Sequence, residues 1–259
     1  MQFLKYVLLI CVFTIVSNAQ ESRTGVPIST TPETTKSPAT TPEPYSVFAG
    51  VYLHGKAGMK ANVAHGYKTD VTFLSTPDFG AQLLFPFTRN GNLGFGLSIG
   101  LGNYGYVNKP ESNVTDNNKV IEQYQFISIF PHFNLSGVIL GLNMNSASGG
   151  TVKTAAGTEV SVVISDTKPD YSKYLNSFNE IVAGVSIPVL DESYGRLNAS
   201  LLVGYALNGI YKDITSDRSY YMFAYDDNNI LGKSSSDNNP KPVSLSVGVS
   251  FLFKIPVIK

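Results

Sequence analysis

The chain has 259 residues, enough for one all-β domain with peripheral segments. Its 19 Lys and Arg residues balance 19 Asp and Glu residues, so no net charge draws it to nucleic acid, and we expect no nucleic-acid partner. Charged residues make up only 15% of the chain, against roughly 25% in an ordinary soluble domain, while aromatic residues reach 12% and there are 23 glycines. This composition is typical of a large buried sheet or of a sheet that faces lipid.

Residues 1–19 have the three parts of a secretory signal peptide. Lys5 supplies the positive charge, residues 7–16 are apolar, and residues 17–19 place small side chains around a cleavage point. An uncleaved membrane anchor is the weaker alternative, because a spanning helix needs about 20 apolar residues. Cys11 is the only cysteine, so removal of the signal peptide would leave no thiol for a disulfide or a metal site.

A segment of different character follows at residues 20–45. It is rich in Thr and Pro and has almost nothing to bury, which predicts an extended, disordered tether. Composition favours a plain spacer over a glycosylated stalk.

From Ser46 onward the chain shows runs in which apolar and polar residues alternate, the pattern of a β-strand with two different faces. Eight such runs are predicted, at residues 46–56, 76–87, 93–102, 120–133, 138–145, 178–187, 196–207 and 243–253. Most are longer than the usual soluble strand of about 5–6 residues and approach the 9–11 of a tilted membrane-crossing strand.

The gaps between these runs alternate in length without exception. The long gaps are residues 57–75, 103–119, 146–177 and 208–242, and the short gaps are residues 88–92, 134–137 and 188–196. Long loops on one side and tight turns on the other are typical of outer-membrane barrels, in which the long loops are extracellular. An even number of strands then places both ends of the barrel, and with them the tether and the C-terminus, in the periplasm.

The two faces of the runs differ in a way that separates lipid from water. In the third run Leu97 lies on an apolar face and Ser98 on a face of Gly and Ser. The apolar faces carry no charged residue, as expected for contact with lipid, whereas Lys56, Glu122 and Glu180 lie on the Gly/Ser faces. A β-sandwich or a lipocalin-type barrel is the alternative, but its wetted face would carry larger polar side chains.

Aromatic residues gather near both ends of the predicted strands, which indicates two girdles at the membrane interfaces. The predicted periplasmic girdle contains Phe85, Phe87, Phe133, Phe251 and Phe253, and the predicted extracellular girdle contains Tyr104, Tyr106, Tyr124 and Tyr211.

With these features, residues 46–254 resemble the small outer-membrane β-barrel families of Gram-negative bacteria. The resemblance implies an all-β fold, a closed antiparallel up-and-down transmembrane β-barrel of about eight strands. It also implies outer-membrane lipids and the barrel-assembly machinery as partners. Such barrels usually end on an aromatic residue, whereas here Phe253 is followed by residues 254–259, a short C-terminal tail.

The sequence offers no convincing catalytic, cofactor or metal site. His54 and His132 are predicted to face the barrel interior, and His65 lies in the first loop. Ser128 is on the same face as His132, but a separation of about 13 Å along the strand is too long for a hydrogen bond. The acidic residues 226–227 and 237 lack the spacing of a calcium loop, and no phosphate-binding glycine motif is present.

The last long gap contains a candidate extracellular contact loop. Tyr220, Tyr221, Phe223 and Tyr225 lie close together there, and Tyr commonly supplies rigid contact surface in binding loops. Extension of the two flanking strands above the membrane explains the same pattern. We therefore expect a non-enzymatic barrel with a structural, adhesive or ligand-contact role, and the alternative is a porin-like channel for small solutes.

Overall fold

The computed structural model describes residues 46–61, 63, 66–73, 76–88, 93–157, 175–212, 220–225, 231–236 and 239–256, with the backbone alone described at 220–225 and 231–236. The predicted signal peptide, the predicted tether and His65 lie outside this part of the chain. Within it, no helix is long and apolar enough to span a membrane.

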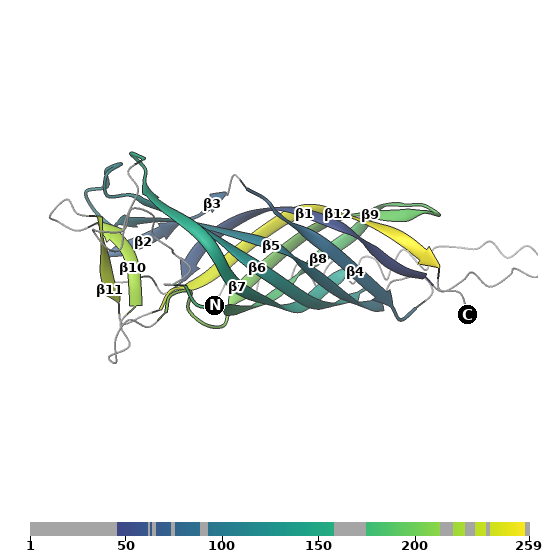
Figure 1. Ribbon diagram of the computed structural model, residues 1–259. Helices are drawn as coiled ribbons and strands as arrows, with labels where there is room; N and C mark the ends of the chain where they lie inside the picture. The colour runs from purple at the N-terminus through teal and green to yellow at the C-terminus, as the bar shows by residue number, and fades with distance from the viewer. Residues whose placement is uncertain are drawn as a thin grey trace, which may run out of the picture.

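Eight long strands form a closed antiparallel ring (Figure 1). They are β1 (Ser46–Ala61), β4 (Asp78–Pro86), β5 (Leu93–Pro110), β6 (Val120–Leu135), β7 (Val138–Thr154), β8 (Phe178–Asp191), β9 (Gly195–Ala206) and β12 (Lys241–Pro256). Each strand pairs with the next in the chain, and β12 closes the ring by pairing with β1 along their whole lengths. The predicted fold class and the eight predicted strands are confirmed.

Four short strands lie near the end with the long connections. β2 (Tyr67–Asp70) pairs with the upper part of β5, and β3 (Thr72–Phe73) pairs with β1, so together they extend the wall above β4. β10 (Tyr220–Tyr225) and β11 (Leu231–Ser236) form a separate hairpin beyond the barrel (Figure 1). The opposite end carries the three short connections, and there the first residue of the sheet, Ser46, pairs with Pro256.

The stagger of the ring sets its width. A path that starts at Phe48 and steps from each residue to its paired partner on the next strand goes once around the ring and returns to β1 at Gly58, ten residues further along (58 − 48 = 10). The path passes through Leu84, Gly96, His132, Gly141, Val182, Gly204 and Ser244. This stagger over eight strands corresponds to a strand tilt of roughly 40° and to an interior that side chains are just able to fill.

The outside of the ring is an apolar belt. Val51 is 61% exposed, Ile181 46% and Val247 57%, and their neighbours on every strand are similar. The belt also includes Leu53, Phe79, Leu83, Ile99, Ile127, Ile129, Leu140, Leu142, Leu201, Leu245 and Val249. A β-sandwich or a soluble barrel buries its apolar face, and soluble proteins rarely expose apolar patches larger than a few hundred Å². The belt therefore faces lipid, as the alternation predicted.

Several strands run further than predicted, and in β7 and β8 the predicted run ends close to a β-bulge. In β7 the residue Ser148 has no partner, since Ala147 pairs with Phe126 and Gly149 pairs with Gln125. The bulge changes the inward-facing residues from odd to even numbers, so both Asn145 and Val152 are buried. A similar irregularity at Val189 interrupts the alternation in β8. The predicted runs ended at 145 and 187 because strict alternation ends at each bulge.

The turn between β6 and β7 shows why its sequence suits a tight connection. Ser136 and Gly137 both have positive φ, 55° and 91°, and the Asn134 side chain accepts a hydrogen bond of 2.9 Å from the Gly137 N–H. Gly adopts this backbone conformation without steric cost.

Candidate functional site

An aromatic cluster fills the interior of the barrel at the end that carries the long connections, which we call the mouth. Tyr104, Tyr106 and Phe126 are 0% exposed, and Tyr104 packs edge-to-face on Phe126 with ring centroids 5.4 Å apart. The buried cluster consists of Tyr104, Tyr106, Val120, Tyr124, Phe126, Val152, Leu175, Phe178, Ala206, Ile210 and Tyr211. The prediction that Tyr104, Tyr106, Tyr124 and Tyr211 form an outer girdle is wrong. All four face inward, where they fill the lumen instead of contacting lipid.

A buried ion pair crosses this mouth. The Lys60 Nζ atom of β1 donates to both carboxylate oxygens of Glu122 on β6, each at 2.9 Å, and both side chains are inaccessible to solvent. The Asn108 side-chain amide of β5 also donates to Glu122. Tyr211 joins them, because its hydroxyl accepts a 2.5 Å hydrogen bond from Lys60 and donates a 2.6 Å bond to Glu122. We call Lys60, Glu122 and Tyr211 the plug triad.

Tyr211 comes from the connection after β9 and is clamped in place by two asparagines. The side-chain amide of Asn239 donates to the Tyr211 carbonyl at 2.6 Å, and its oxygen accepts from the Tyr211 N–H at 3.0 Å. The Asn176 side chain donates to the same carbonyl at 2.5 Å, and Leu175 forms a β-bridge with Tyr211. Burial raises the pKa of the Tyr211 hydroxyl well above its ordinary value, so the group remains a neutral donor.

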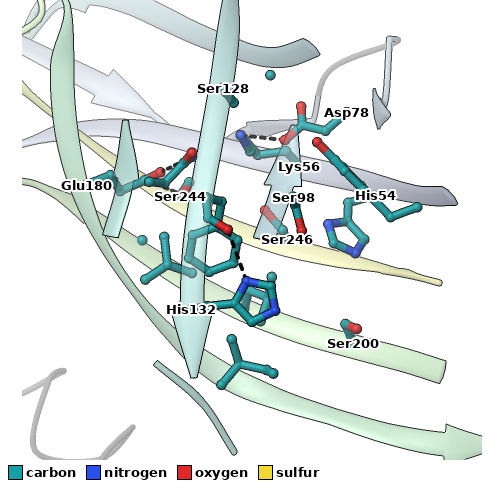
Figure 2. Close-up of a pocket in the computed structure, with 18 of the residues that line it drawn as sticks. His54, Lys56, Asp78, Ser98, Ser128, His132, Glu180, Ser200, Ser244 and Ser246 are labelled. Atoms are coloured by element: carbon teal, nitrogen blue, oxygen red, sulfur yellow. Dashed lines mark hydrogen bonds and ion pairs between the residues drawn. The ribbon is translucent and has the colours of Figure 1, made fainter. Parts of the chain in front are cut away.

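Below the plug triad lies a polar chamber (Figure 2). It has a volume of about 70 Å³ and is lined by Ser, Gly, Asn, Gln and His residues together with Lys56, Asp78 and Glu180. Five larger side chains complete its wall: Tyr52, Phe130, Ile139, Val182 and Leu202. Lys56 forms an ion pair of 2.5 Å with Asp78 and lies 3.7 Å from the centre of the Tyr104 ring. The aromatic cluster above and the chamber below therefore share Tyr104 as their boundary.

Glu180 reaches the chamber from β8, opposite Lys56 and Asp78 (Figure 2). Its carboxylate accepts hydrogen bonds from the hydroxyls of Tyr104 at 2.8 Å and Ser244 at 2.6 Å, and from the Asn143 side-chain amide at 3.2 Å. Lys56, Glu122 and Glu180, which the alternation placed on the Gly/Ser faces, are all inside the barrel, as predicted.

His54 and His132 both line the chamber, as predicted, but they form no catalytic group with Ser128. The Nδ1 atom of His132 lies 3.1 Å from the carbonyl oxygen of Phe130, which makes it the donor, and Nε2 lies 3.4 Å from the Gln82 side-chain amide. Ser128 instead donates to the Asn145 side chain at 2.6 Å. Among the described residues, no group of three or more His, Cys, Asp or Glu is arranged to hold a metal ion.

The short-turn end of the interior is apolar, with Phe48, Leu84 and Leu252 buried together. Arg196 lies 5.2 Å from the centre of the Phe48 ring and donates to Asp191 at 2.6 Å. Lys254 also pairs with Asp191, at 2.8 Å. The lumen thus runs from this apolar floor through the polar chamber to the aromatic cluster and the plug triad.

The candidate contact loop falls on β10. The backbone of Tyr220, Tyr221, Phe223 and Tyr225 pairs with β11, and their side chains lie outside the described residues. The sequence prediction missed the plug triad itself. A signal was present, because Lys60 continues the inward series of His54 and Lys56, and Glu122 has opposite charge on the inward face of β6.

No protein-family model matches the sequence. No curated protein matches it either. The solved structures that resemble it include Ail of Yersinia pestis, in complex with a heparin analogue (12% identity, TM-score 0.33, covering 80% of this chain and 99% of Ail). They also include OprG of Pseudomonas aeruginosa (9% identity, TM-score 0.37, covering 83% of this chain and 98% of OprG). A third example is AlkL in lipid bilayers (12% identity, TM-score 0.36, covering 88% of this chain and 100% of AlkL). OprG and AlkL are both described as outer membrane proteins. By its closed ring of eight antiparallel strands and its exposed apolar belt, the chain is a small β-barrel of the outer-membrane type.

Proposed function

We propose that the protein is a non-enzymatic, non-conducting barrel of the bacterial outer membrane, which acts through the end that carries its long connections. The observation that carries this proposal is the plug triad. Lys60, Glu122 and Tyr211 link β1, β6 and the connection after β9 across the lumen. An ion path along the axis would have to separate all three.

The cost of such an opening supports a permanently closed lumen. Breaking one partner out of a buried ion pair typically costs about 3–5 kcal/mol, because the other charge is left uncompensated. Opening would also pull Tyr211 away from Asn176 and Asn239, which bind its backbone. Spontaneous opening would therefore be rare, and the plug works as a structural part of the barrel.

The far side of the plug supports a contact role. Above the belt, β5, β6 and β7 continue as a wall that carries polar outward side chains, among them Gln123, Thr151 and Lys153. The β10–β11 hairpin adds further strand structure at the same end. We place this end outside the cell and the tether and C-terminus in the periplasm, with Tyr220, Tyr221, Phe223 and Tyr225 as the candidate contact residues.

A small-solute channel is the second candidate function. The polar chamber favours it, because charged and hydroxyl groups line the lumen directly below the plug. In this case the plug triad would be a gate, and its removal would connect the chamber to the extracellular end.

Single-channel recording in planar bilayers tests the proposal. The unmodified protein should give no discrete conductance steps, and Tyr211→Ala should also stay silent, because the Lys60–Glu122 pair, the rest of the aromatic cluster and the apolar floor still close the lumen. Steps from Tyr211→Ala would support the gated channel. Tyr205→Ala is the matched control, since Tyr205 is 42% exposed on the outer face and should leave the bilayer silent. Regular steps from the unmodified protein would contradict a closed lumen and support the channel.

An epitope inserted within residues 226–230 tests the orientation of the barrel. It should be labelled on intact cells, and labelling only after lysis would reverse the orientation.

A further inference from the structure

The charges that line the chamber do not balance. Lys56 is its one ammonium group, and Asp78 and Glu180 are its two carboxylates, among the residues that the structure describes. All three are buried, at 4%, 7% and 1% exposure. Lys56 is paired with Asp78, which leaves Glu180 as a buried carboxylate without a cationic partner. A buried charge of this kind requires compensation.

The hydrogen-bond partners of Glu180 are neutral groups. Three donors, on Tyr104, Ser244 and Asn143, direct hydrogen bonds at its two oxygens. Gly204 of β9 makes room for this arrangement, because a Cβ atom there would overlap the Glu180 carboxylate and crowd the Ser244 hydroxyl.

A second observation points to a ligand beside this carboxylate. The side-chain oxygen of Asn143 is buried and has no hydrogen-bond partner, and Asn143 is only 9% exposed. The nitrogen of the same amide lies 3.2 Å from the Glu180 carboxylate. The free oxygen is bonded to the same carbon as this nitrogen, so it also lies close to the carboxylate. Buried acceptor atoms are nearly always satisfied. A positive ion between the amide oxygen and the carboxylate would satisfy both groups.

We propose that the chamber binds a monovalent alkali cation, with Glu180 and the Asn143 side-chain oxygen as its protein ligands. The oxygen ligands are of the hard type that such ions prefer, and a single positive charge neutralises the excess carboxylate. A divalent ion would leave a net positive charge and normally takes more carboxylate ligands than the chamber supplies. The chamber volume of about 70 Å³ accommodates the ion and several waters that complete its coordination.

Anomalous diffraction tests the site in the unmodified protein. Crystals of the full chain grown in rubidium chloride should show a rubidium peak within coordination distance of Glu180 and the Asn143 oxygen. Glu180→Gln should lose this peak. Asp191→Asn should keep it, because Asp191 is a carboxylate at the short-turn end, outside the chamber. The absence of a peak in the unmodified protein would overturn the proposal.

Stability measurements supply a readout in solution. A ligand that binds only the folded state raises the ratio of folded to unfolded protein by 1 + [L]/Kd, about 100-fold at 100 times Kd. Rubidium chloride should therefore stabilise the protein against urea relative to N-methylglucamine chloride of equal ionic strength. Asn143→Leu, which keeps the carboxylate, should abolish the difference if Glu180→Gln fails to fold. Equal stability in the two salts, with an infrared band of a protonated carboxyl group that Glu180→Gln removes, would show that a proton compensates the charge and that the proposal is wrong.

Discussion

In the membrane belt the strands carry apolar side chains on the outside and polar ones on the inside, and at the mouth the same strands carry the reverse. In the belt, β6 turns Ile127 and Ile129 outward and Ser128 inward. A few residues higher, the same strand turns Gln123 outward and buries Tyr124 and Phe126. In both regions of β6 the odd-numbered residues face outward and the even-numbered residues face inward. What differs is whether the outward or the inward residues are apolar.

This exchange shows where the surroundings of the barrel change from lipid to water. Within lipid an outward side chain has to be apolar, so the interior is left to polar and small residues. Above the lipid the outward side chain faces water, and the apolar side chains move inside, as in a soluble sheet. The mouth is therefore built as a small water-soluble barrel with its own core, the aromatic cluster, on top of a transmembrane barrel.

The largest effect should come from the buried ion pair of the mouth. Lys60→Met should destabilise the protein by about 3–5 kcal/mol, because it leaves the Glu122 charge buried without its partner. The free energy of unfolding from urea titration in lipid vesicles measures this. Lys60→Met combined with Glu122→Leu should recover most of the loss, since the pair is then replaced by apolar groups. A single variant as stable as the double variant would mean that the pair is not desolvated.

The outer face offers the sharpest contrast between the two regions. Ile129→Arg should cost about 2–4 kcal/mol and impair insertion, because it places a charge in the lipid. Gln123→Arg, on the same strand and the same face but above the belt, should change the unfolding free energy by less than about 0.5 kcal/mol. Both positions are exposed, so a soluble barrel would tolerate the two substitutions equally.

The inner and outer faces of the belt should respond differently to one added methyl group. A Cβ atom at Gly80 of β4 would collide with the backbone of β5 at Ile99, whereas at Gly55 the nearest atom is 3.8 Å away. Gly80→Ala should therefore cost about 1–3 kcal/mol through overpacking. Gly55→Ala should be neutral or stabilise by up to about 1 kcal/mol. Urea titrations of both variants check the difference, and equal effects would show that the close strand contact at Gly80 is absent.

The smallest effect is expected for an ion pair on the outside of the mouth. Asp70 of β2 pairs with Lys109 of β5, and both side chains are partly exposed. Asp70→Asn should cost less than about 1 kcal/mol, and the loss should shrink in high salt. A cost as large as that of Lys60→Met would show that this pair is also shielded from water.

The sequence predicted the belt well and the mouth poorly, for a physical reason. Alternation alone placed Leu97, Ser98 and Glu180 on the correct faces, because the lipid imposes one simple rule on every strand. The pattern of Tyr104 and Tyr124 was equally regular, but aromatic residues suit both an interfacial girdle and a buried core. Which of the two they form depends on the height of the strand above the membrane. The inward faces of Lys60 and Glu122 follow from the alternation, but their contact with each other and with Tyr211 does not, because it joins residues far apart in the sequence.

The most direct test of the two-region account is a pair of spin labels on β6. Single cysteines at Ile129 and Gln123, in a Cys11→Ser background, would carry the labels in protein reconstituted into lipid vesicles. We predict strong relaxation by lipid-soluble oxygen and weak relaxation by a water-soluble nickel complex at Ile129. At Gln123 we predict the reverse ranking. Similar nickel accessibility at both positions would mean that the whole outer face meets water, and would contradict the account.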